Sequence, residues 1–186
     1  MKRTKTRALC EGAVMVALAT ALSYVKFFEL PQGGSVCIGM LPIFLYCIRW
    51  GWKDGFLASF AYGLLQLIFD GAYAWGPWSM LLDYLLAFAV LGVAGFFWKM
   101  KGGIFIGTVV GSLCRFVIHF ISGVTIYKIY EPVELFNSMW TNPYLYSAAY
   151  NGSYVAIDMV LCLVIFGVLY KPLQKYITGA DLGTVA

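Results

Sequence analysis

Residues 103–126 read GIFIGTVVGSLCRFVIHFISGVTI, an almost unbroken run of apolar side chains. A helix rises about 1.5 Å per residue, so this run would measure roughly 36 Å and could cross a hydrocarbon core of about 30 Å. Four polar residues recur within it at helical spacing, on one face: Ser112, Arg115, His119 and Ser122. The sequence therefore predicts a membrane-spanning helix with one polar face.

The rest of the chain has the same character. Of its 186 residues, 61% are hydrophobic and 12% are charged, against roughly 45–50% and 25% in an average soluble domain. Five further apolar stretches lie at about 8–28, 36–52, 55–72, 78–98 and 144–170. We therefore predict an all-α integral membrane protein with six transmembrane helices in a single domain, 1–186. The second and third stretches are short, and we expect them to be tilted or partly buried.

The cations indicate an orientation for these helices. The positive-inside rule assigns the loops rich in Lys and Arg to the cytoplasm. Most of the cations fall on one side of the predicted spans: Lys2, Arg3, Lys5, Arg7, Arg49, Lys53, Lys99, Lys101, Lys171 and Lys175. Both termini are then cytoplasmic in the cell membrane, which agrees with an even number of spans.

The first apolar stretch has an alternative interpretation as a cleaved signal peptide ending near Ala21-Leu22-Ser23. Glu11 interrupts its apolar run, and cleavage would leave five spans with the termini on opposite sides. We therefore favour a retained helix.

Polar side chains also form stripes on two other predicted helices. Ser147, Asn151, Tyr154 and Asp158 lie on one face of the last helix, and Tyr62, Gln66, Asp70 and Tyr73 on one face of the third. Ionisable groups within a membrane are costly and are functional candidates by default. Because Arg115 and Asp158 fall at similar depths, we predict that they pair. A structural ion pair is the favoured interpretation, and a ligand contact is the alternative.

Aromatic side chains gather near the predicted outer ends of the helices. An interfacial aromatic belt would account for any one of them. It does not account for Asp83, which lies about one turn inside the fourth helix. A carboxylate among aromatic rings suits a flat organic cation, through Coulomb attraction and cation–π contact. Asn151 would offer a paired donor and acceptor to the edge of a heterocycle.

Motifs for catalysis, metal binding and nucleic-acid binding are missing from the sequence. It contains no phosphate-binding loop, no H-E-x-x-H and no G-x-S-x-G. There is one histidine, and the five cysteines show no C-x-x-C spacing, so we expect reduced thiols and no metal or cofactor. Nucleic-acid binding would need a basic patch that the chain lacks. We predict a binding protein and not an enzyme.

Small residues recur at four-residue spacing on the first helix, at Ala13, Ala17 and Ala21. A second ridge is formed by Gly107 and Gly111. Such ridges let helices approach each other closely. They would serve packing within the chain or, for the alanine ridge, docking to another membrane protein.

Four segments carry a resemblance to a known family: Pro31-Gln32-Gly33-Gly34-Ser35, Gly71-Ala72-Tyr73 with Leu82-Asp83-Tyr84, His119-Phe120-Ile121-Ser122-Gly123, and Tyr146-Ser147-Ala148-Ala149-Tyr150-Asn151-Gly152. They occur in family order with similar spacing over most of the chain. Together they resemble the thiamine-specific S components, called ThiT, of energy-coupling factor (ECF) transporters.

The resemblance implies a six-helix fold with an outward-facing thiamine pocket lidded by the outer loops. It implies ligand contacts from Tyr73, Asp83, Tyr84, His119, Tyr146 and Asn151. Trp140 and Tyr127 are candidates for the aromatic partner of His119, and Gln32 is the first-loop candidate. The alanine ridge would dock to a transmembrane T component, and two cytoplasmic ATPases would supply the energy.

Asp83 departs from the family pattern, because the acidic residue of this pair can be Glu, which is one methylene longer. Three other functions stay open. The chain could capture another vitamin or precursor, such as riboflavin or hydroxymethylpyrimidine. It could also be a stand-alone secondary transporter that uses Arg115 and Asp158 for protons. A small membrane enzyme is the least favoured, because the sequence offers no nucleophile–base pair.

Overall fold

The computed structural model describes residues 4–30, 33–70, 76–129, 134–135 and 138–182, and the side chains at 126–138 lie outside that description. Its helical elements are α1 (Lys5–Ser23), α2 (Met40–Trp50), α3 (Trp52–Asp70), α4 (Pro77–Ser79), η2 (Met80–Leu86), α5 (Ala87–Ala89), η3 (Val90–Phe97), α6 (Gly103–Ile129) and α7 (Pro143–Ile177). The four elements from α4 to η3 follow one another without a break and form one helical segment. The described residues therefore contain six helical segments, as predicted.

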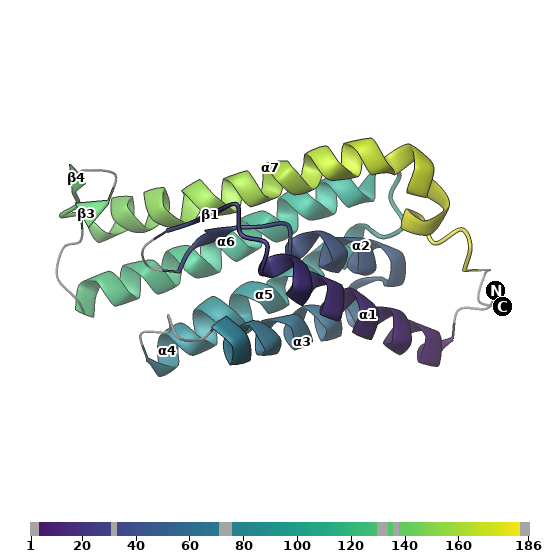
Figure 1. The fold of residues 1–186 in the computed structure, drawn as a ribbon, viewed down its shortest axis with the longest axis horizontal. Helices are drawn as coiled ribbons and strands as arrows, with labels where there is room; N and C mark the ends of the chain where they lie inside the picture. Colours follow the sequence, from purple (N-terminus) through teal and green to yellow (C-terminus); the bar gives the residue numbers. More distant parts are fainter. Residues whose placement is uncertain (1–3, 31–32, 71–75, 130–133, 136–137, 183–186) are drawn as a thin grey trace.

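Two short antiparallel hairpins, absent from the predictions, lie in the connections. β1 (Phe28–Glu29) pairs with β2 (Ser35–Val36), with Phe28 opposite Val36. β3 (Glu134–Leu135) pairs with β4 (Ser138–Met139) between α6 and α7. In Figure 1, β1 is drawn near mid-length of the molecule, and its partner β2 packs against α7.

Four segments are long and apolar enough to cross a membrane by length and composition: α1, the 77–97 segment, α6 and α7. α2 is different, because its 11 residues would span only about 16 Å. It is also buried around nearly its whole circumference, with Leu41 its one half-buried residue. A helix that is apolar on every face belongs in a core. The predicted span at 36–52 is therefore a short core helix preceded by a strand.

Local sequence explains where several of these helices begin and end. The Thr4 hydroxyl accepts from the Arg7 N–H at the start of α1. Asn142 caps α7 in the same way, and Pro143 follows at the first helical position. Gly51 has φ +89°, a left-handed conformation that lets α2 turn directly into α3.

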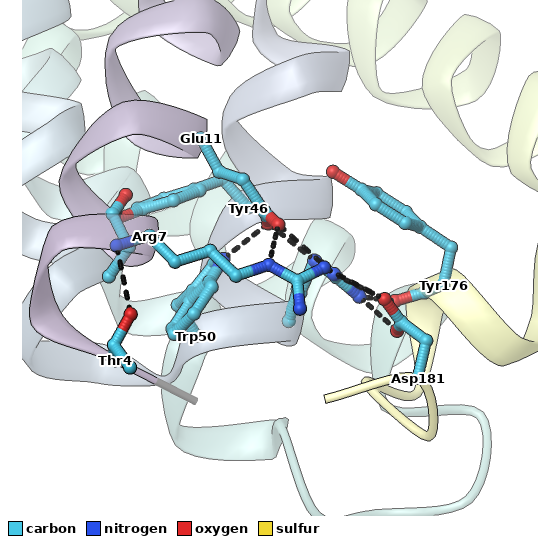
Figure 2. A network of polar contacts seen from close by, with 9 residues as sticks. Thr4, Arg7, Glu11, Tyr46, Trp50, Tyr176 and Asp181 are labelled. Atoms are coloured by element: carbon cyan, nitrogen blue, oxygen red, sulfur yellow. Dashed lines mark hydrogen bonds and ion pairs between the residues drawn. The ribbon is translucent and has the colours of Figure 1, made fainter. Parts of the chain in front are cut away.

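A polar cluster joins α1, α2 and the C-terminal segment. Arg49 is buried, with its guanidinium 2.7 Å from Glu11 Oε2 and 2.6 Å from Asp181 Oδ1. Its guanidinium also lies 3.8 Å from the centre of the Tyr176 ring. Figure 2 shows Glu11, Trp50, Tyr176 and Asp181 converging from three elements. This end of the molecule also holds both chain termini (Figure 1).

The predictions interpreted Arg49 only as a cation that marks the cytoplasmic side, and Glu11 only as an interruption of an apolar run. Burial of both groups required partners from distant parts of the chain. Those partners, Asp181 and Tyr176, lie more than a hundred residues away from Arg49.

Candidate functional site

Asp83 lies in η2, where the helix widens into π-helical turns. Such turns interrupt helices at functional sites more often than elsewhere. Three donors reach its carboxylate: Ser79 Oγ at 2.8 Å and Ser122 Oγ at 2.6 Å from Oδ2, and His119 Nδ1 at 3.0 Å from Oδ1. The side chain keeps 23% of its surface exposed. The carboxylate is therefore held on several sides and is still accessible.

His119 connects Asp83 to Arg115. Arg115 Nε donates to His119 Nε2 over 3.2 Å. A guanidinium has no acceptor, so Nε2 must be the acceptor in this contact and carry no proton. The proton of the neutral imidazole is then on Nδ1, where it donates to Asp83.

Arg115 is enclosed on its other sides. Its Nη1 lies 3.5 Å from Asp158 Oδ2 and 2.8 Å from Met40 Sδ. Its guanidinium also lies 4.6 Å from the centre of the Phe88 ring. Asp158 is fully buried and accepts the Cys37 backbone N–H at 2.9 Å through its second oxygen. The contact between Arg115 and Asp158 thus belongs to a longer chain of polar groups.

Asp83, His119, Arg115 and Asp158 form what we call the central relay. Arg115 lies against the buried Asp158, whereas Asp83 contacts His119 and no Lys or Arg among the described residues. A partly buried carboxylate gains from the approach of a cation, because Coulomb attraction is strong in a low-dielectric interior. The relay is therefore suited to a cationic ligand at its exposed member, Asp83.

Asn151 is committed to the helix interface. Its Nδ2 donates to the His119 carbonyl and to the Ser147 carbonyl, each at 3.1 Å. Its Oδ1 accepts from the Tyr154 hydroxyl at 3.0 Å. Tyr154 is also the described ring next to His119, with centroids 5.8 Å apart. In this structure the Asn151 amide thus fixes α7 against α6 at the level of His119.

The loop between α1 and α2 (24–39), here called the first loop, packs onto aromatic rings of α7. The Gly34 N–H donates to the Tyr150 hydroxyl at 2.9 Å, and Tyr150 stacks on Tyr146 with centroids 5.9 Å apart. Leu30 and Val36 are buried with these rings, and Trp140 packs against the same cluster. Together with the Cys37 contact, this fixes the described part of the loop beside the central relay.

Two further groups, Tyr84 of η2 and Lys26 in the loop after α1, contact the end of α3. The Tyr84 hydroxyl is not directed into the central relay, because it donates to the Asp70 carbonyl at 2.8 Å. Lys26 Nζ lies 2.9 Å from Glu29 and 3.4 Å from Asp70. Partial burial lowers the pKa of Lys26, but these two carboxylates outweigh it and raise the pKa above its ordinary value.

The polar stripe of α3 does not join the central relay at Gln66, which donates to Ser23 of α1 at 2.9 Å. The polar stripes of α6 and α7 do contact each other, through Arg115 with Asp158 and through Asn151 with the His119 carbonyl. Ser112 is the exception on α6, because its buried hydroxyl has no hydrogen-bond partner in the described part of the chain.

Several predicted site residues cannot be placed. Gln32 and Tyr73 lie outside the described residues, and the side chain of Tyr127 is not described. The alanine ridge is placed clearly: Ala13, Ala17 and Ala21 are all exposed on α1. No described part of the chain therefore covers that face of α1.

Three contacts of the central relay were not predicted from the sequence. Ser79 lies one turn before Asp83, and this i, i+4 spacing could have indicated it. Met40 and the Cys37 backbone N–H come from a different part of the chain. Nothing in the local pattern around Arg115 or Asp158 pointed to them.

Comparison with known proteins places this chain in a family. Residues 9–178 match the family model described as thiamine transporter protein. The chain belongs to this family. It is 35% identical over 177 residues to the thiamine transporter ThiT of Bacillus subtilis, covering 87% of this chain and 89% of that protein. It is 29% identical to ThiT of Lacticaseibacillus paracasei, covering 93% and 91%.

Solved structures show the fold expected of this thiamine transporter family. ThiT from Listeria monocytogenes superimposes with a TM-score of 0.82 at 23% identity, covering 94% of this chain and 99% of that one. The S component of a bacterial ECF transporter gives a TM-score of 0.63 at 17% identity, covering 93% and 98%. The fold of ECF S components, predicted from scattered motifs, is therefore confirmed.

Proposed function

We propose that this chain is the thiamine-binding S component of an ECF-type vitamin uptake transporter. The observation that carries the proposal is the Asp83 carboxylate, which three side chains hold and which stays 23% exposed, in a chain of the thiamine transporter family. Thiamine carries a permanently cationic thiazolium ring. At Asp83 this ring would meet a fixed carboxylate in a low-dielectric site, where Coulomb attraction is strong.

The remaining contacts would come from the aromatic and amide groups around Asp83. His119 would stack on the ligand, and Tyr84, Tyr146 and Asn151 would hydrogen-bond the aminopyrimidine. Since the Tyr84 hydroxyl and the Asn151 amide bond within the protein, these two groups would have to exchange partners on binding. Four more side chains would complete the contacts: Gln32, Tyr73, Tyr127 and Trp140.

We further propose that the chain captures thiamine from outside the cell and performs no chemistry. Both termini would be cytoplasmic, and a transmembrane T component with two ATPases would supply the energy. The exposed alanine ridge of α1 supports this arrangement, because small residues allow a partner helix to approach closely.

The first test is a titration of purified protein with thiamine, followed by tryptophan fluorescence. We expect saturable quenching, and Asp83→Asn should weaken binding about tenfold or more. Asp54→Asn, the same change in the first turn of α3, is the matched control and should bind normally. Absence of quenching, or equal affinity of Asp83→Asn and the unmodified protein, would contradict the proposal.

Competing ligands separate the alternatives. Hydroxymethylpyrimidine shares the pyrimidine of thiamine but lacks the cationic ring. Asp83→Asn should therefore weaken binding of hydroxymethylpyrimidine much less than binding of thiamine. Preferential binding of riboflavin or of hydroxymethylpyrimidine would assign a different S component. Thiamine uptake by proteoliposomes that contain this chain alone would instead indicate a secondary transporter.

A further inference from the structure

We propose that Arg115 and Asp158 are positioning residues for Asp83, the carboxylate that would bind the ligand, and not only a structural ion pair. Arg115 fixes His119 in the tautomer that carries its proton on Nδ1, and His119 thereby holds Asp83. The predicted effect on ligand affinity rests on the proposed function. The protonation of His119 can be tested without any ligand.

The direction of each hydrogen bond follows from the residue types. Arg115 can only donate, so its 3.2 Å contact assigns His119 Nε2 as acceptor. A neutral imidazole has one N–H, which must then be at Nδ1, 3.0 Å from Asp83 Oδ1. Turning the ring over or moving its proton would break one contact or both.

Arg115 can fix the tautomer only if it is itself fixed. The opposing carboxylate of Asp158 restrains it, and the Met40 sulfur and the Phe88 ring pack around the guanidinium. Asp158 is restrained in turn by the Cys37 N–H. The position of Asp83 is therefore set through three side chains, Asp158, Arg115 and His119, by the Cys37 N–H at the end of the first loop.

This arrangement prepares Asp83 for one particular contact. A carboxylate has about four lone-pair positions, and Ser79, Ser122 and His119 occupy three of them. The position left over is on Oδ1, at the side away from His119. A ligand that meets a fixed carboxylate loses less free energy in ordering it than one that meets a mobile side chain.

The chain has a single histidine, so ¹⁵N-histidine labelling reports on His119 without ambiguity. In the ligand-free protein in detergent, we expect ring ¹⁵N shifts of a neutral imidazole with Nδ1 protonated. In Asp158→Asn and Arg115→Met, Nε2 should become protonated in part of the molecules, as the Nε2–H tautomer or as an imidazolium that still donates from Nδ1 to Asp83. Thiamine affinity should fall about tenfold in each variant, mainly through faster dissociation. Asp54→Asn, far from the relay, should leave the ring signals unchanged.

Two results would overturn the proposal. One is a ligand-free, unmodified protein whose His119 is protonated on Nε2, or on both nitrogens, at pH 7. This measurement needs no variant to fold. The other is an unchanged tautomer in folded Asp158→Asn and Arg115→Met, which would leave the pair only a structural role. If the protein fails to bind thiamine but shows the Nδ1–H tautomer, the proposed function is wrong and the relay stands.

Discussion

At the scale of single residues, Gly123 shows how closely α6 and α7 approach beside the relay. A Cβ added there would overlap the Ser147 hydroxyl and lie 3.0 Å from Asn151 Nδ2. The close approach lets Ser147 donate to the Phe120 carbonyl at 2.8 Å and Asn151 to the His119 carbonyl. The glycine thus allows α7 side chains to bond the backbone of α6.

Gly123→Ala should therefore destabilise the protein, although alanine is the better helix former. Forcing a methyl group into a packed contact costs about 1–3 kcal/mol. We expect the thermal unfolding midpoint in detergent to fall by several degrees. Gly167→Ala on α7 is the matched control, since its added Cβ meets nothing within 4 Å. Equal midpoints for the two variants would mean that α6 and α7 do not approach closely at Gly123.

At the scale of elements, buried charges join parts of the chain that local structure leaves separate. The central relay connects η2, α6, α7 and the end of the first loop. The Arg49 cluster connects α1, α2 and the segment after α7. Hydrogen bonds from Arg49 hold the pKa of Asp181 below its ordinary value of 3.8. This contribution to stability is full above about pH 4 and is lost as the pH falls through the lowered pKa.

Arg49→Met should lower the free energy of unfolding by about 1–3 kcal/mol, because Glu11 and Asp181 lose their buried partner and keep only Arg7, at 2.8 and 3.2 Å. The variant should also lose most of the acid-dependent part of its stability that comes from Asp181. Both effects are measured by thermal unfolding in detergent between pH 3 and pH 7. Lys53→Met, an exposed cation on α3, should change stability by no more than about 0.5 kcal/mol. A similar loss in both variants would contradict a specific role for Arg49.

At the scale of the whole molecule, the central relay and the alanine ridge lie on different elements. Ala13, Ala17 and Ala21 are exposed on α1, whereas the central relay is formed by η2, α6 and α7. Binding of ligand and docking of a partner should therefore respond to different substitutions.

Ala17→Trp should leave thiamine binding by the purified chain intact and abolish its co-purification with the T component and ATPases. A large ring on the ridge would hold the partner helix away. Val168→Trp, at a position on α7 that is 71% exposed, is the control and should preserve the complex. Normal assembly of Ala17→Trp would rule out docking through this ridge.

The sequence by itself determined the membrane class, the polar faces of α6 and α7, and the family. These features are local or periodic: apolar length sets the spans, and helical spacing puts Ser112, Arg115, His119 and Ser122 on one face. Asp83 and His119 could be chosen as candidate site residues because ionisable groups are costly in a membrane.

Only the tertiary structure decided which groups these residues contact. Asn151 was expected to offer its amide to a ligand, but it bonds the α6 backbone. Arg115 contacts Met40 as well as Asp158, and Arg49 reaches Asp181. Such partners depend on how each helix is rotated and how far it is shifted along its neighbour. Packing of the whole chain fixes both, so no single segment encodes them.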